Sequence, residues 1–169
     1  VVTDTATMPQ GKVSDRATYD SQSLAIRSRD ISQGPVTVKL TFTDDLVSGT
    51  MNMGGNETPV KVDVEGGLFA DGPGAGRAIA ALPLKEGYST TFRNFDVMRQ
   101  KVTIKQAKVT GIEDVTVPAG TFKAWKVELA SAEGEPGSQT LWVDTASRRV
   151  VKTSGALANG ALVTSELVK

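Results

Sequence analysis

The sequence predicts an all-β fold, mostly antiparallel, in the form of a strongly curved open sheet or half-barrel of about nine to ten strands with at most one or two short helices. Three observations predict it. Apolar and polar residues alternate over many short segments, clusters of Gly, Pro, Asn and Asp separate these segments, and a single segment has a helix-favouring composition. We expect residues 1–169 to form a single domain, because this length is typical of one domain.

The N-terminal strands begin after a segment with little periodicity. Residues 1–20 mix Thr, Asp, Pro and Gly, and we expect an irregular lead-in there. A strand is expected over 23–31. The clearest alternation follows over 36–43, which is typical of a half-buried antiparallel strand. Its apolar face comprises Val36, Val38, Leu40 and Phe42.

Short turns continue this pattern into a meander and then interrupt it. Return strands are expected over 47–53 and 60–65, each after a turn rich in Asp, Gly or Asn. Residues 66–76 break the alternation. Residues 75–82 are rich in Ala and end before Pro83, which predicts one short helix.

Strands resume over 87–96 and 101–112. In the second of these, the apolar positions change from even to odd numbers, which moves the apolar side chains to the other face unless one residue is inserted. We therefore expect a β-bulge near Lys105 and Gln106.

The best-specified hairpin follows, with its turn at Pro118-Ala-Gly120. Pro fixes φ on entry to the turn and Gly adopts positive φ without strain, so strands are expected on both sides of it. Further strands are expected over 139–144, 149–153 and 161–168. Asn159-Gly160 precedes the last of these and is typical of a two-residue hairpin turn.

The composition excludes several classes of function. Lys and Arg number 19, as do Asp and Glu, so the formal net charge is zero and we expect no nucleic-acid partner. The chain has no Cys and no His, which excludes thiol nucleophiles, Cys/His zinc sites and histidine-dependent triads. No apolar run approaches the roughly 20 residues that span a bilayer. We expect the protein not to be transmembrane and to need no metal or cofactor.

Two motifs invite a catalytic or ligand-binding interpretation. Residues 71–81 contain a Gly-rich stretch before the expected helix, but Arg77 occupies the position of the last Gly of a dinucleotide fingerprint, and the Gly-Lys-Ser/Thr ending of a P-loop is absent. We interpret the segment as a connection. A set of carboxylates could in principle serve acid/base catalysis or bind calcium, yet it falls on turns and solvent-facing positions, which favours a solvated surface. These are Asp44, Asp45, Asp63, Glu65, Glu113 and Asp114.

The aromatic residues are few and offer the best candidates for ligand contact. Trp125 shares a strand face with Val127 and Leu129, whereas Trp142 points to the face opposite Leu141 and Val143. A sheet that is apolar on both sides suggests curvature around a covering helix or a ligand. Ordinary packing under a loop is the alternative. The predicted ligand-binding residues are Trp142, Trp125, Tyr88 and Phe92.

Four segments carry a resemblance to a known family. They are Val115-Thr-Val-Pro-Ala-Gly-Thr-Phe-Lys-Ala-Trp-Lys-Val127, Thr140-Leu-Trp-Val-Asp-Thr-Ala-Ser-Arg-Arg-Val-Val-Lys152, Thr164-Ser-Glu-Leu167 and Ala81-Leu-Pro-Leu-Lys-Glu-Gly-Tyr-Ser89. The pattern resembles exported bacterial β-rich domains of unknown function, which look like the half-barrels of periplasmic lipoprotein carriers. The resemblance implies an exported protein, periplasmic or associated with the outer membrane, whose concave sheet can receive an acyl chain or another apolar group.

These observations lead to one main expectation about function. We expect a non-enzymatic exported β-domain that binds an apolar ligand, such as a lipid or an acyl group, or a protein partner. The alternative is an accessory or structural domain of a larger exported hydrolase, with no ligand site of its own. An enzyme that uses the carboxylates would need them to converge in a cleft.

Overall fold

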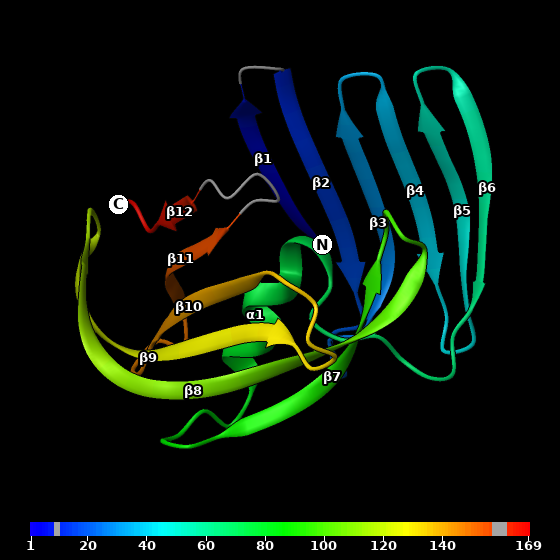
Figure 1. Ribbon diagram of the computed structural model, residues 1–169. Coiled ribbons are helices and arrows are strands. Elements are labelled where there is room, and N and C mark those ends of the chain that lie inside the picture. Colours follow the sequence, from blue (N-terminus) through cyan, green and yellow to red (C-terminus); the bar gives the residue numbers. More distant parts are fainter. Residues whose placement is uncertain (9–10, 157–161) are drawn as a thin grey trace. The chain divides into compact units, whose positions relative to one another are not determined.

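The computed structural model describes residues 1–8, 11–156 and 162–169, and of residues 6–8 it describes the backbone alone. In this part of the chain, twelve strands form two antiparallel sheets of six strands each, neither of them closed (Figure 1). The all-β class is therefore confirmed, whereas the expected single sheet of nine or ten strands is wrong. The chain divides into two compact units, residues 1–75 with 93–102 and residues 76–92 with 103–169. The single domain stays a prediction.

The first sheet is a meander in which each strand pairs with the next one along the chain, as the sequence predicted for its central strands. Its order is β1 (Val2–Met8), β2 (Gly11–Tyr19), β3 (Ile26–Gln33), β4 (Val36–Phe42), β5 (Leu46–Met53) and β6 (Asn56–Asp63).

The irregular lead-in expected over residues 1–20 is wrong, because β1 and β2 lie there and pair in continuous register. These strands are rich in Thr, Ser and Asp and contain few apolar residues. In β2 only Ala17 is fully buried. Backbone pairing with β3 holds the hairpin in place, together with the few side chains of β2 that pack on the core or pair with polar groups of the first unit. Residues 1–20 therefore lack the alternation of apolar and polar residues by which a strand is predicted from sequence.

The core of the first unit follows from the alternation in β4. Val38, Leu40 and Phe42 are each at most 3% exposed, while the residues between them face solvent. Phe42 packs edge-on against Phe95, with ring centroids 6.0 Å apart. The buried members of this core are Ala17, Ile26, Val38, Leu40, Phe42, Val47, Met51, Val60, Val64, Leu68, Phe95 and Val97.

One short helix is present where it was predicted. A 3-10 turn, η1 (Gly72–Gly74), leads directly into α1 (Ala75–Ala81), with Pro73 in the first turn. Ala78, Ile79 and Ala80 of the helix are buried. Among the described residues, no helix has the length and apolar character that crossing a membrane requires.

The second sheet also follows chain order. Its strands are β7 (Ser89–Asp96), β8 (Lys101–Val117), β9 (Gly120–Ser131), β10 (Ser138–Asp144), β11 (Val150–Ala156) and β12 (Leu162–Glu166). Both β7 and β8 contribute residues to the two units. Asn159-Gly160 lies outside the described residues, and the flanking strands β11 and β12 pair antiparallel.

The long strand β8 contains the predicted hairpin turn and a bulge. The turn after Val117 is confirmed, and Gly120 adopts a φ of 142°. The bulge near Lys105 and Gln106 is wrong, because the register shifts instead between Val109 and Gly111. Thr103 explains the error. Thr103 is 2% exposed, so the buried positions of this strand are odd-numbered from residue 103 onward. Its polar side chain hid this pattern in the sequence.

The two faces of the second sheet are covered by different parts of the chain. A Cβ atom on Gly76 would meet Val150 at 3.2 Å and Leu141 at 3.8 Å, so α1 lies against the face that carries Leu141. The opposite face contains a small apolar cluster of Val115, Val117, Ala124 and Val151. The sequence predicted a sheet that is apolar on both faces. A helix, α1, covers one of these faces.

Candidate functional site

Trp125 and Trp142 lie on neighbouring strands but on opposite faces of the second sheet. Trp125 is directly opposite Val143, whereas Trp142 is directly opposite Lys126. Partners that stand opposite each other in an antiparallel pair project to the same face. The predicted orientation of the two indole rings is therefore confirmed.

The other two predicted ligand-binding residues lie in or just before β7, the edge strand of this sheet. The carbonyl of Tyr88 accepts a hydrogen bond from the N–H of Val109 at 2.8 Å, and Phe92 follows in β7. Both side chains are half-buried. Because Trp125 and Trp142 project to opposite faces, the four residues do not form one site on one face. Ligand contact at each of them stays a prediction.

Trp142 has the most distinctive surroundings of the four. Its half-buried ring lies between two lysines from the adjoining strands, with the Nζ atoms of Lys126 and Lys152 at 5.9 and 5.8 Å from the ring centroid. Its indole N–H donates a hydrogen bond to Glu113. Ammonium groups at this distance from an indole are attracted by the negative face of the ring. The hydrogen bond to Glu113 orients the ring, and the two ammonium groups lie over it. We call Trp142, Lys126, Lys152 and Glu113 the Trp142 cluster.

The Trp142 cluster lies over a group of buried apolar side chains, which we call the apolar floor. Trp142 packs against the buried cluster of Val115, Val117, Ala124 and Val151, together with Ala119, Phe122 and Leu167. The turn of the β8–β9 hairpin is joined to the end of β12 by a hydrogen bond from the N–H of Ala119 to the carbonyl of Leu167, at 3.1 Å. This combination of an apolar floor and a charged rim can hold an amphipathic molecule.

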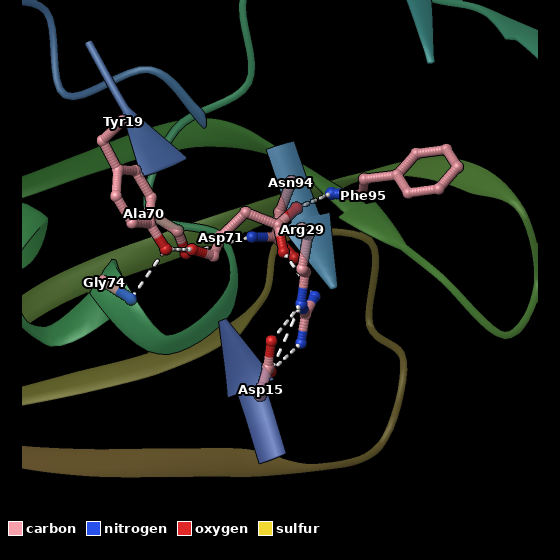
Figure 2. A network of polar contacts seen from close by, with 8 residues as sticks. All are labelled: Asp15, Tyr19, Arg29, Ala70, Asp71, Gly74, Asn94 and Phe95. Atoms are coloured by element: carbon pink, nitrogen blue, oxygen red, sulfur yellow. Dashed lines mark hydrogen bonds and ion pairs between the residues drawn. The ribbon is translucent and has the colours of Figure 1, made fainter. Parts of the chain in front are cut away.

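A second polar group lies in the first unit and surrounds the buried carboxylate of Asp71, which is 3% exposed (Figure 2). Arg29 donates from one terminal nitrogen to Asp71 at 3.0 Å and from another to Asp15 at 2.7 Å. The other Asp71 oxygen accepts the backbone N–H of Phe95 at 2.8 Å. Both carboxylate oxygens therefore have partners within the protein.

Tyr19 completes this network from the end of β2. Its hydroxyl donates to the carbonyl of Asp71 at 2.6 Å and accepts the N–H of Gly74 at 2.7 Å (Figure 2). A Cβ atom on Gly74 would lie 2.5 Å from Cε2 of Tyr19, so glycine is required here. We call Asp15, Tyr19, Arg29 and Asp71 the Asp71 network.

Burial dominates the electrostatics of the Asp71 network. It raises the pKa of Asp71 above its ordinary value, and the charge of Arg29 and the N–H of Phe95 offset part of this effect. Burial also raises the pKa of Tyr19 to about 12. Burial alone would lower the pKa of Arg29, but its hydrogen bond with Asp15 and the charge of Asp71 raise it. Because each group has an internal partner, the network fixes the segment before α1 to the first sheet.

This geometry decides how the Gly-rich segment is interpreted. Tyr19 already occupies the N–H of Gly74, which a phosphate-binding loop would present to its ligand. Arg77 is exposed. The interpretation of residues 71–81 as a connection therefore agrees with the structure. All six carboxylates considered from the sequence are exposed, namely Asp44, Asp45, Asp63, Glu65, Glu113 and Asp114.

Sequence reasoning missed the partners of Trp142 and the whole Asp71 network. Lys126 and Lys152 were visible as charged residues in strands, but only the register of β9, β10 and β11 brings them beside the ring. The unusual signal for Asp71 was a carboxylate between the apolar residues of 68–70 and a Gly-rich turn.

The chain matches a family model over residues 3–167, and the family is described as Protein of unknown function (DUF3108). Comparison with the curated proteins and with the solved structures gives no match.

Proposed function

Because the chain belongs to the DUF3108 family, whose function is unknown, we propose from its own residues that it is a non-enzymatic exported β-domain that binds an apolar ligand. The ligand is a lipid or an acyl group. It binds on the face of the second sheet that carries Trp142.

One observation carries this proposal. Trp142 projects from the face opposite Leu141, against which α1 packs, and its half-buried ring lies over an apolar floor. Aromatic side chains supply large contact area at binding sites, and their half-exposed rings can bury further on contact with an apolar chain. The buried cluster beneath the ring supports it, so the exposed part of the ring is the apolar surface that such a chain would meet.

Two further facts support a binding role without catalysis. The sequence has no Cys and no His, so thiol and imidazole chemistry are excluded. The buried and half-buried ionisable side chains of the Asp71 network are hydrogen-bonded to one another or to the backbone. Export is supported by the resemblance carried by residues 115–127, 140–152 and 164–167.

Native mass spectrometry before and after organic extraction tests the proposal. We expect a discrete additional mass that extraction removes. The mass should be lost from Trp142→Ala and kept in Trp125→Phe, which changes the indole ring on the opposite face. An extractable mass that persists in Trp142→Ala would contradict the proposed site. A protein that stays free of ligand after incubation with a lipid extract would contradict an apolar ligand and favour a protein partner.

A further inference from the structure

The side chains that flank Trp142 form one row across five strands. Gly111, Lys126, Trp142, Lys152 and Glu166 are each directly opposite the next, from β8 to β12. Side chains in such a row share one face and lie close enough to interact. Charges and open space along this row can therefore define which end group a bound apolar molecule carries.

The two lysines of the row differ in their partners. Lys152 donates to the Glu166 carboxylate at 2.8 Å. Within the described ranges, the Lys126 ammonium has no carboxylate within 4.0 Å, and it lies over the ring of Trp142. The nearby Glu113 carboxylate accepts the indole N–H of Trp142. Lys126 is thus the ammonium group of this row that remains available to an anion.

Open space adjoins Lys126 on the side away from Trp142. The opposing residue there is Gly111, and a Cβ atom built on it would meet nothing within 4 Å. Glycine therefore leaves room beside the Lys126 ammonium on the same face of the sheet. This room lies at the end of the row opposite the Lys152–Glu166 pair.

From this arrangement we infer that the apolar ligand carries an anionic end group, a carboxylate or a phosphate, which pairs with Lys126 over Gly111 while its hydrocarbon chain lies on Trp142. The inference rests on the proposed function, because it names the ligand class of the same site. Lys126 is half-buried as a residue, and partial burial strengthens the pairing of a charge with an anion because water screens it less.

Isothermal titration calorimetry with three probes of equal chain length tests the inference. The probes are sodium laurate and dodecyl phosphate, each below its micellar concentration, and the uncharged methyl laurate below its solubility limit. We expect Lys126→Met to weaken binding of the better anionic probe about tenfold and to leave methyl laurate unchanged, because Met keeps the apolar stem. The comparison of laurate with dodecyl phosphate identifies the end group.

Two further variants make the result specific. Lys123→Met removes an exposed lysine from the other face of the same strand and should change neither affinity. Gly111→Val fills the open space without changing charge and should weaken the anionic probes alone. The inference would be overturned if all three probes bound equally and Lys126→Met changed none of the three affinities. That result would leave the proposed function standing. Failure of every probe to bind the unaltered protein would contradict both.

Discussion

Arg29 joins two carboxylates, and its removal would leave one of them buried without a counter-charge. We expect Arg29→Met to lower the free energy of unfolding by roughly 3–5 kcal/mol, because Asp71 is 3% exposed and would keep a desolvated charge. Adding Asp71→Asn should restore part of the loss, since it neutralises that charge and keeps an oxygen for the N–H of Phe95. Urea unfolding measures all three proteins.

Arg27→Met is the matched control for this prediction. Arg27 lies two residues earlier in β3, and its side chain is 45% exposed beside Asp20 and Asp44. Exposed ion pairs contribute about 0–1 kcal/mol. Equal losses in the Arg27 and Arg29 variants would show that burial of Asp71 does not make the ion pair special.

Tyr19 makes the first unit less stable at alkaline pH. Tyr19→Phe keeps the ring but leaves the N–H of Gly74 and the carbonyl of Asp71 without their partner, which should cost roughly 1–3 kcal/mol. Because burial raises the pKa of Tyr19 from 10.0 to about 12, the folded state holds this proton more tightly. The stabilisation is complete below pH 10 and is lost as the pH rises through about 12.

The difference in unfolding free energy between the unaltered protein and Tyr19→Phe should therefore shrink between pH 10 and pH 12. Measuring this difference cancels the titration of the lysines. Tyr88→Phe serves as the control, and a constant difference across the same pH range would refute the assignment to Tyr19.

For single residues, the sequence predicted the sheet face to which a side chain projects better than the residues that it contacts. The period of two placed Trp125 on the face of Val127 and Trp142 on the face opposite Leu141, because adjacent strand residues project to opposite sides. It could not predict Lys126 and Lys152 beside Trp142, since their meeting depends on strand register. For the same reason, the long-range pairing of Asp71 with Arg29 could not be predicted.

Among the elements, the 3-10 turn η1 depends on close packing against β2. We expect Gly74→Ala to destabilise the protein by about 1–3 kcal/mol, because its Cβ atom would overlap the ring of Tyr19. Gly111→Ala is the matched control, since its Cβ atom meets nothing within 4 Å. Thermal unfolding compares the two, and equal melting temperatures would contradict the packing argument.

Elements bounded by strong turn residues were predictable, and elements without an apolar face were not. Pro118 and Gly120 identified the β8–β9 turn because both have narrow conformational uses. The strands β1 and β2 offered no such pattern, and they are held by backbone pairing and, in β2, by buried Ala17 and the polar contacts of Asp15 and Tyr19. The bulge in β8 was misplaced because buried Thr103 resembled a solvent-facing residue.

For the whole molecule, we expect a single cooperative unfolding transition, although the chain divides into two units. The boundary between the units falls inside both β7 and β8. A strand cannot easily lose its pairing at one end while it stays fully ordered at the other, so unfolding of one unit should propagate into the other.

Two probes test this expectation of a single domain. Tryptophan fluorescence reports the second unit, which contains Trp125 and Trp142, and amide hydrogen exchange in β4 reports the first. Coincident midpoints in urea are expected. Separate midpoints would show two domains.

Chain order within the two sheets also has a consequence for folding kinetics. In the described part of the chain, neighbouring strands of either sheet are neighbours in sequence, without a crossover. Pairings of this kind have a low relative contact order for an all-β protein, and low contact order accompanies fast folding. Each sheet can therefore grow one strand at a time from any hairpin that forms first. Refolding should be faster than for a Greek-key sandwich of the same length, in which the fourth strand of each motif must return to lie beside the first.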